Sequence, residues 1–390
     1  MESKKTHTKV DYFSEITLYE KKSNEFCTFD YAEFVKKKRE AEGFKLYVAG
    51  DIMFHSPQLS AALKSGEYDF FESFRYVKDV IKDGLAIANL ETTIAEDNFM
   101  GYPMFRTPAV AVKNLKFAGF DILGLANNHA LDGKLEGVIR TKQTVLDNQI
   151  VPLGTYFEDE ETLPQIVEVN GRKIAFLNYT YGLNGLDGFL GGKDYMINIL
   201  NEEKVKSDID YTKKNADGII VMVHWGNEYV INNHVESQER WLNFFNQNGV
   251  DVVLGSHPHV IEPDGFLENN GHKMYYIYSL GNFLSNQRRE YMNQPYGEDG
   301  VILELTIKPF DKKRIEVKDV VYHPTWVKRT KDPLTYEILP VYDGLKGFIP
   351  ELTDGDIEKL KESKDRTLSI LKTGKYIGDI HDGTELQSNN

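Results

Sequence analysis

The chain has 390 residues, of which 41% are hydrophobic and 27% charged, and its formal net charge is −14. This acidic balance argues against a basic patch that binds nucleic-acid backbones or anionic lipid surfaces. The length suits one large or two ordinary domains that fold without disulfides. The chain has a single cysteine, Cys27, so an intramolecular disulfide is excluded.

Residues 1–43 form a predicted N-terminal extension. Its start is polar and rich in lysine, with no apolar segment behind it, so we expect no signal peptide. No apolar run in the chain approaches the roughly 20 residues that a membrane helix needs. The charged stretch at 31–42 is typical of a solvated helix, because acidic residues bracket its basic run.

From residue 44 to 327 we expect one domain in which short apolar strands alternate with amphipathic helices. Helical spacing of apolar residues marks segments near 69–83, 135–146 and 235–245. Alternation of this kind is typical of βαβ units. The strands of this alternating part are predicted at 45–50, 85–89, 121–126, 218–223 and 250–255.

The other predicted strands have no helices between them. Asn170-Gly171 is a strong hairpin signal between strands at 165–169 and 173–178. We therefore predict an α/β fold, a two-sheet α/β/β/α sandwich with helices outside. A loop with five glycines is expected at 182–193, and residues 328–390 are a predicted C-terminal extension that packs on the domain and ends in a polar tail. Further strands are predicted at 273–279, 301–308 and 315–322, and a helix at 356–372.

Polar side chains follow the alternating strands at the points where each strand ends. In an open α/β sheet the ligand crevice lies outside the carboxyl ends of the strands, so we expect these side chains to gather at one edge. Imidazole combined with carboxylate and amide oxygens favours Mn, Fe or Zn, as one or two ions. Taken alone, each of these polar residues would more often be a helix cap or a buried hydrogen-bonded group than a metal ligand. The residues are Asp51, Glu91, Asn128, His129, His224, His257 and His259.

Local features of two of these segments support the prediction. His257 and His259 flank Pro258, and side chains two apart in an extended backbone point the same way. Glycine at positions 50 and 255 indicates that another backbone approaches closely there.

Six short motifs occur in order along the chain, and together they closely resemble the CapA/PgsA family of bacterial poly-γ-glutamate capsule synthesis. The resemblance runs from about residue 45 to about residue 283. That family is in turn similar to the calcineurin-like metallophosphoesterases, which implies a two-sheet sandwich and a two-metal site. The motifs are Gly50-Asp51-Ile52-Met53, Asn89-Leu90-Glu91, Asn127-Asn128-His129-Ala130-Leu131-Asp132, His224-Trp225-Gly226-Asn227-Glu228, Gly255-Ser256-His257-Pro258-His259 and Tyr278-Ser279-Leu280-Gly281-Asn282-Phe283.

The resemblance implies a role for each candidate residue. Asp51 and His259 would hold a first metal, Glu91 would bridge two metals, and Asn128, His224 and His257 would hold the second. His129 would assist the leaving group. The chain departs from the phosphoesterase pattern Asp-x-His at Met53, a poor ligand for such metals, and His55 is a candidate replacement.

Three further residues are candidates for catalysis or substrate binding. Glu228 lies beside His224 and is a candidate general base, extra ligand or hydrogen-bond partner of a histidine. Arg106 could pair with an anionic substrate or be a solvated surface arginine. Asn282 fits either a turn or a substrate contact.

Two functional hypotheses follow from the residues and the resemblance. The first is a metal-dependent hydrolase that cleaves a phosphoester or an amide near an anionic polymer. The second is a non-catalytic assembly or export subunit of a capsule synthase; a sugar- or peptide-binding module without metal is a third. We expect an anionic polymer or phosphoester substrate, membrane-bound synthase subunits as partners, and no nucleic acid. The resemblance implies the extracytoplasmic face of the cell envelope, and a soluble cytoplasmic protein is the alternative.

Overall fold

The computed structural model describes residues 43–231 and 234–382. The predicted helix at 31–42, nearly all of the predicted N-terminal extension and the last residues of the polar tail lie outside the described residues. Within the described ranges no helix is long and apolar enough to span a bilayer.

The first sheet has nine strands, and its centre is parallel. Strands β1, β4, β7 and β8 run in the same direction, and β16 joins the edge of β1 in the antiparallel sense. The order is β18 (Leu334–Pro340), β17 (Ile315–Lys331), β16 (Asp299–Pro309), β1 (Phe44–Ile52), β4 (Leu85–Leu90), β7 (Ile122–Gly124) and β8 (Val151–Leu153), with β15 (Asn282–Leu284) paired to β1 and β19 (Lys375–Tyr376) to β17.

The second sheet has six strands and is likewise parallel at its centre, with an antiparallel strand at each edge. The predicted hairpin at Asn170-Gly171 is confirmed, because β9 and β10 pair across it. The order is β13 (Ile261–Asn269), β14 (His272–Leu280), β12 (Val252–Ser256), β11 (Gly218–His224), β10 (Arg172–Thr180) and β9 (Gln165–Val169).

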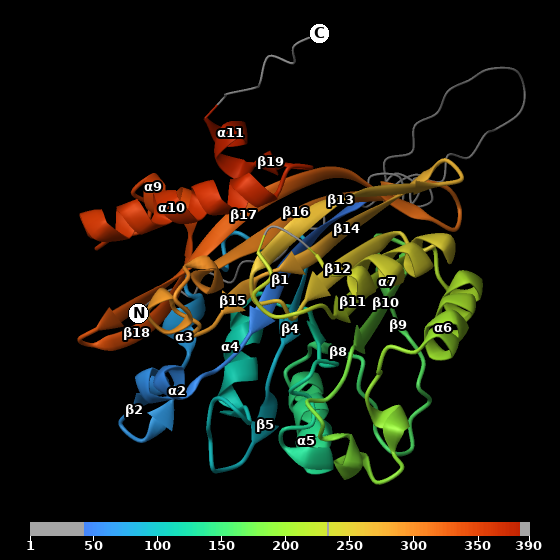
Figure 1. Ribbon diagram of the computed structural model, residues 1–390, viewed down its shortest axis with the longest axis horizontal. Helices are drawn as coiled ribbons and strands as arrows, with labels where there is room; N and C mark the ends of the chain where they lie inside the picture. The colour runs from blue at the N-terminus through green and yellow to red at the C-terminus, as the bar shows by residue number, and fades with distance from the viewer. Residues whose placement is uncertain (1–42, 232–233, 383–390) are drawn as a thin grey trace, which may run out of the picture.

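Three buried apolar clusters show how the layers stack. One, with Leu46 and Phe176, lies between the two sheets. Another covers the outer face of the first sheet with α2 (Ser56–Ala62), α3 (Phe71–Phe74), α4 (Val110–Ala118) and α5 (Lys134–Asp147). The last places α6 (Glu202–Asn215) and α7 (Glu236–Gln247) on the second sheet. The predicted α/β/β/α sandwich is confirmed, and Figure 1 shows these helices around the strands.

The helix predicted near 69–83 is the one helical segment that the structure corrects. Only Phe71–Phe74 is helical, although Phe74, Val77 and Ile81 are buried as their spacing predicts. The N–H of Val77 bonds the carbonyl of Phe74, and the N–H of Val80 bonds that of Val77. These bonds span three residues and not four, so the segment continues as tight turns.

The C-terminal part of the chain joins the first sheet. β17 continues from Ile315 to Lys331, so it passes through the predicted boundary at residues 327 and 328. β18 pairs with β17 and forms an edge of the sheet. The predicted helix at 356–372 is present as α10 (Asp354–Ile370).

The remaining short elements are β2 (Leu63–Lys64), β3 (Glu67–Tyr68), β5 (Thr93–Ala95), β6 (Arg106–Pro108), α8 (Arg289–Met292), α9 (Val341–Leu345), α11 (Ile377–His381) and 3₁₀ turns at Asp187–Leu190, Asp194–Met196 and Tyr296–Glu298.

A β-bulge at Gly50 turns Asp51 toward the second sheet. The register of β1 against β4 shifts at this point. Before the bulge Tyr47 packs against the outer helices, and after it Ile52 does, so the odd-numbered Asp51 faces the other way. A Cβ atom at Gly50 would lie 1.9 Å from the carbonyl oxygen of Gly281. The predicted close backbone approach at position 50 is therefore confirmed.

A similar approach occurs at the end of β12. A Cβ atom at Gly255 would lie 1.9 Å from the carbonyl oxygen of Tyr278 on the neighbouring strand β14. Any side chain at position 255 would push these two strands apart. The prediction from glycine at position 255 is confirmed as well.

Glu262, in β13, makes stability depend on pH. Its Oε2 accepts a hydrogen bond of 2.7 Å from Gln238 Nε2, while Oε1 has no hydrogen-bond partner among the described residues. Burial raises the pKa of Glu262 from 4.5 to about 8. The unfolded chain thus releases this proton at lower pH than the folded protein does. The raised folded pKa means that stability falls as the pH rises between these two values.

We expect Glu262→Gln to raise the free energy of unfolding by about 2–4 kcal/mol at about pH 8.5. The neutral amide keeps an acceptor for Gln238 and removes the buried carboxylate. At about pH 4.5 the gain should vanish, because the wild-type group is then protonated when folded. Urea unfolding at the two pH values measures this difference, and a variant less stable than wild type at the higher pH would contradict the prediction.

Candidate metal centre

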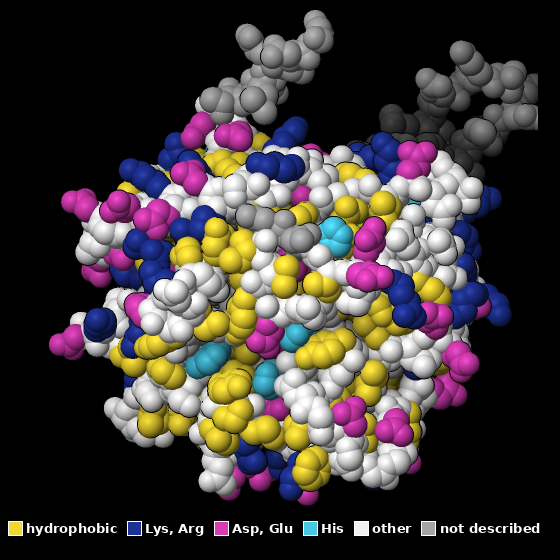
Figure 2. Space-filling view, in the orientation of Figure 1, with side chains coloured by type: hydrophobic (Ala, Val, Ile, Leu, Met, Phe, Trp, Pro, Cys, Tyr) yellow, Lys and Arg dark blue, Asp and Glu magenta, His cyan; other side chains and the backbone are white. Residues whose placement is uncertain are grey.

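Six of the predicted site residues meet at one edge of the two sheets. Each lies at or just after the carboxyl end of a parallel strand, and all are at most 3% exposed. Figure 2 shows histidine and acidic side chains gathered near the middle of this face. The residues are Asp51 near the end of β1, Glu91 after β4, Asn128 after β7, His224 at the end of β11, and His257 and His259 after β12.

The possible ligand atoms form two overlapping groups. Glu91 belongs to both, once with His257 and His259 and once with Asp51 and His224. Within each group the ligand atoms lie within 4.8 Å of one another. This position of Glu91 fits a bridging carboxylate. Asp51 shares a ligand group with His224 of the second sheet, whereas the resemblance implied that Asp51 and His259 hold the same metal.

Asp51 is held by hydrogen bonds from several parts of the chain. Its Oδ1 accepts a bond of 2.8 Å from Asn89 Nδ2. Its Oδ2 lies 3.1 Å from His259 Nδ1 and accepts a bond of 3.2 Å from the backbone N–H of His257. The carboxylate therefore joins the two sheets at their common edge.

His224 has both ring nitrogens in polar contacts. Nδ1 lies 3.0 Å from Ser256 Oγ, and Nε2 lies 2.9 Å from Asn128 Oδ1 and 3.5 Å from Glu91 Oε1. The contact with Ser256 fixes the ring so that Nε2 faces the other candidate ligands. A ligating imidazole commonly has its second nitrogen held in this way.

Burial and neighbouring charges together set the protonation of this cluster. It lowers the pKa of His224 to about 3 and that of His257 well below the usual value, so both rings are neutral and offer lone pairs. Burial also raises the pKa of Glu91 to about 8. Burial acts to lower the pKa of His259, but the nearby Glu91 and Asp51 outweigh it and raise the value to about 9.

Two buried atoms at the centre support occupation by a metal ion. Oε1 of Glu91 and Nδ1 of His257 have no hydrogen-bond partner among the described residues. Leaving such groups unpaired costs about 1–3 kcal/mol each. A divalent cation bound by the deprotonated Glu91 and the neutral imidazole of His257 would satisfy both atoms, because metal binding releases the ligand's proton. The residues present therefore fit a divalent metal, which Asp51, Glu91, Asn128, His224, His257 and His259 would hold.

The backbone at the His257-Pro258-His259 segment differs from the prediction. His257 has φ of 98° and His259 has φ of 58°, so both residues are in the left-handed region. The prediction of an extended backbone was wrong here, although both side chains reach the cluster. Such conformations cost of order 1–3 kcal/mol and persist where surrounding contacts hold them.

Met53 stands where the Asp-x-His pattern has its histidine, and His55 was the candidate replacement for that ligand. Met53 is buried, and its sulfur lies 4.0 Å from Gln287 Nε2. His55 does not belong to either group of possible ligands among the described residues. Its Nδ1 accepts a hydrogen bond of 3.2 Å from the backbone N–H of Asn286. Met53 and Asp51 are two residues apart beyond the bulge, so an extended backbone there would place both side chains on the same side.

We expect Met53→His to raise the amount of bound divalent metal. An imidazole at this position adds a good ligand beside Asp51, whereas a thioether binds Mn or Zn poorly. Repacking should cost no more than roughly 1–3 kcal/mol. Mass-spectrometric metal stoichiometry measures the gain, with Met53→Leu as the apolar control. A folded Met53→His variant that binds no more metal than the control would show that this position does not face the site.

His129 and Asp132 form a pair at the edge of this cluster. His129 Nδ1 lies 2.7 Å from Asp132 Oδ2, which also accepts a hydrogen bond of 2.6 Å from the backbone N–H of Phe105. The Phe105 ring contacts the His129 ring edge-on. These contacts hold the imidazole by Nδ1, so Nε2 is the nitrogen available to a substrate. His129 lies close enough for its charge to act on Glu91.

The other candidate residues lie in different surroundings. Glu228 is exposed and does not belong to either ligand group among the described residues. Arg106 donates to the backbone oxygen of Asp97 at 3.3 Å. Asn282 is fully buried, and its amide donates to the carbonyl of His259 at 3.2 Å and to Gln287 Oε1 at 2.8 Å. The roles predicted for these three residues stay predictions.

Three contributors had no role assigned from the sequence. Asn89 donates to Asp51, Asp132 holds His129, and Tyr181 lies with its ring centroid 4.6 Å from that of His257. Both Asn89, near the end of β4, and Asp132, in the turn before α5, belong to the six motifs, and membership of a motif is a signal that could have identified them. Tyr181 directly follows β10 and carries no such signal.

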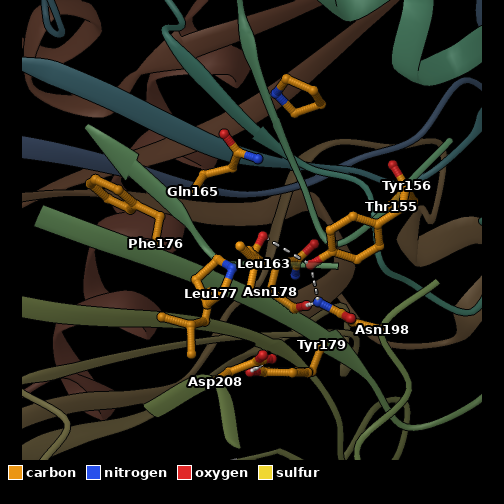
Figure 3. A pocket seen from close by; sticks show the side chains of 13 residues that line it. Thr155, Tyr156, Leu163, Gln165, Phe176, Leu177, Asn178, Tyr179, Asn198 and Asp208 are labelled. Atoms are coloured by element: carbon orange, nitrogen blue, oxygen red, sulfur yellow. Dashed lines mark hydrogen bonds between the residues drawn. The ribbon is translucent and has the colours of Figure 1, made fainter. Parts of the chain in front are cut away.

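An enclosed space beside β8 and β10 is a different kind of feature (Figure 3). Its volume of about 10 Å³ suits about one water molecule. Asn198 donates to the Tyr156 hydroxyl at 3.0 Å, and the Tyr179 hydroxyl donates to Asp208 at 2.7 Å. Polar side chains that line it already bond one another, and the space is too small for a substrate.

The fold and the cluster define a two-sheet α/β protein with a buried carboxylate–histidine cluster whose composition fits a metal ion. Residues 45–287 match the family described as bacterial capsule synthesis protein PGA_cap. The chain belongs to this family, as the resemblance of the six motifs predicted.

Curated relatives are capsule proteins of two Bacillus species. The chain is 31% identical over 224 residues to the PGA biosynthesis protein CapA of Bacillus subtilis (strain 168), a match that covers 56% of this chain and 55% of that protein. It is 28% identical over 277 residues to the capsule biosynthesis protein CapA of Bacillus anthracis, covering 64% and 62%. The chain thus spans between half and two thirds of the length of these two relatives.

Similar solved structures include two bacterial proteins. The calcineurin-like phosphoesterase YfkN of Bacillus subtilis has a TM-score of 0.39 at 12% identity, with 84% of this chain and 98% of that one covered. The sulfate thiohydrolase SoxB of Thermus thermophilus has a TM-score of 0.41 at 12% identity, with 85% and 59% covered.

Proposed function

We propose that this capsule-synthesis family member is a divalent-metal-dependent hydrolase that cleaves a phosphoester or an amide bond. The observation that carries the proposal is the buried cluster in which Glu91 Oε1 and His257 Nδ1 lack partners among the described residues. The His129–Asp132 pair beside this cluster supports it. A scaffold without chemistry has no need for both features at one edge.

The chain's own residues have distinct tasks in this proposal. When bound, a divalent metal supplies Lewis acidity that lowers the pKa of water and stabilises negative charge. Water loses a proton to solvent as its oxygen adds to phosphorus or to the amide carbon, and the bond to the leaving oxygen or nitrogen breaks. The leaving group takes a proton from His129 Nε2, which regains one from solvent. Asp132 keeps His129 oriented through Nδ1.

Partners and location follow from the family. We infer an anionic polymer or a phosphoester as substrate, membrane-bound capsule-synthase subunits as partners, and action at the cell envelope. The metal is inferred to be Mn, Fe or Zn, because imidazole and carboxylate ligands together suit these ions.

A non-catalytic assembly subunit is the second candidate function. The observation that favours it is Met53, buried at the position where the phosphoesterase pattern has a histidine ligand. A centre with one fewer ligand can keep a metal for structural reasons alone.

Hydrolysis assays separate the two functions. We expect the protein supplied with Mn²⁺ to release nitrophenol from nitrophenyl phosphate esters or to shorten poly-γ-glutamate. A preparation of His129→Ala, purified in parallel, controls for contaminating hydrolases. Metal-loaded protein that turns over none of these substrates with Mn²⁺, Fe²⁺ or Zn²⁺ would favour the assembly subunit.

A further inference from the structure

A short turn after β10 contacts the three residues that would hold the second metal. Tyr181 donates its backbone N–H to the carbonyl of His224 at 2.9 Å, and its ring centroid lies 4.6 Å from that of His257. Three residues later, Asn184 Oδ1 accepts a hydrogen bond of 3.2 Å from Asn128 Nδ2. These candidate ligands come from β7 in the first sheet and from β11 and β12 in the second. The turn therefore joins ligands that the two sheets supply separately.

Apolar packing fixes the position of this turn. Leu183, in its middle, is 1% exposed and belongs to a buried cluster with Ala126 and Leu131, which lie on either side of Asn128 in the chain. Asn184 has φ of 53°, a left-handed conformation that asparagine tolerates better than most residues. Glycine would suit this conformation at least as well, so turn formation alone does not require an amide at position 184.

The Asn128 side chain is held at both of its ends. Its NH₂ group donates to Asn184, while its Oδ1 lies 2.9 Å from His224 Nε2. Burial raises the pKa of Tyr181, and a hydrogen bond between Tyr181 and Asn128 acts in the opposite direction. An amide offers a metal its oxygen, because the NH₂ group is a donor only. Contacts that hold the NH₂ group at the turn therefore keep Oδ1 directed at the other ligands.

We propose that Asn184 is a positioning residue of the metal centre, which orients the Asn128 amide so that Oδ1 binds the metal. Tyr181 supports the same orientation. The proposal rests on the proposed function and deepens it, because it gives the predicted glycine-rich loop at 182–193 a task at the centre. Hydrogen-bond partners of a metal ligand commonly contribute 10- to 100-fold to metal affinity.

Zinc titration measures the contribution of Asn184. We expect Asn184→Gly to lower the affinity for Zn²⁺ by about 10-fold in competition with a chromogenic chelator. Glycine adopts the same left-handed backbone, so this variant removes the side chain without straining the turn. Asn270→Gly is the matched control and should bind Zn²⁺ as wild type does. Asn270 is exposed, has φ of 52° and lies in the hairpin between β13 and β14.

A double-mutant cycle shows whether Asn184 acts through Asn128. Asn128→Ala removes the ligand itself, so adding Asn184→Gly to that variant should lower the affinity no further. A turn that only stabilises the fold, or that acts through His224 or His257, would cause the same loss in both backgrounds. Unchanged affinity in Asn184→Gly, or an equal loss with and without Asn128, would overturn the proposal.

The side-chain amide signals of Asn128 test the contact in metal-free protein. In NMR spectra of the isotope-labelled full chain, they are the pair of signals that Asn128→Ala removes. We expect one proton of this pair to shift upfield in Asn184→Gly and to keep its position in Asn270→Gly. Signals that stay in place in Asn184→Gly would overturn the proposal. This shift in a protein that binds no Zn²⁺, or a loss of affinity in one that shows no turnover, would count against the hydrolase alone.

Discussion

Replacement of His224 and His257 by alanine in one variant is expected to remove bound metal from the protein. Both rings are buried and neutral, and both face Glu91 across the candidate ligand groups. Loss of even a hydrogen-bond partner of a ligand lowers metal affinity 10- to 100-fold, so loss of two ligands should lower it by at least about 100-fold. Mass spectrometry of purified protein should show at least one Mn, Fe or Zn ion per chain in wild type and nearly none in the variant.

The control for this experiment removes a histidine that lies outside the candidate metal centre. His381→Ala removes an exposed histidine at the end of α11 and should leave the metal content unchanged. Circular dichroism shows whether the double variant is folded. Wild-type metal content in a folded double variant would contradict the assignment of both ligands.

Replacement of His129 by alanine is expected to lower turnover by about 10²- to 10⁴-fold while the metal content stays the same. His129 is held through Nδ1 by Asp132 and does not belong to either group of possible ligands among the described residues. In the proposed mechanism it therefore serves the leaving group and not the ion. Steady-state kinetics and metal analysis of the same preparation measure the two quantities separately.

Asp132→Asn refines this second prediction. The amide can still contact His129 Nδ1, but it cannot balance a positive imidazole, so kcat should fall more than KM changes. A merely structural Asp132 would lower thermal stability without changing the pH dependence of kcat. Equal turnover in wild type and His129→Ala would remove His129 from the mechanism.

Much of the fold was accessible from local patterns. Apolar strands alternate with amphipathic helices, and each kind of element shows its own spacing of apolar residues within one short stretch of sequence. The sandwich and most of its elements could therefore be predicted. The chemistry-bearing residues were accessible for the same reason, since Asp51, Glu91 and His224 stand where apolar strands stop. The helix near 69–83 was not, because apolar spacing reports which side chains are buried and not whether the bonds span three residues or four.

The residue types of the centre and their positions at strand ends were determined by the sequence alone. Only the tertiary structure decided which of them meet. The β-bulge at Gly50 depends on the backbone of Gly281, and the N–H of His257 bonds Asp51 across 206 residues of chain. The left-handed backbone at His257 and His259 is likewise maintained by surrounding contacts. Contacts between segments so far apart set the distances within a site, and no local pattern encodes them.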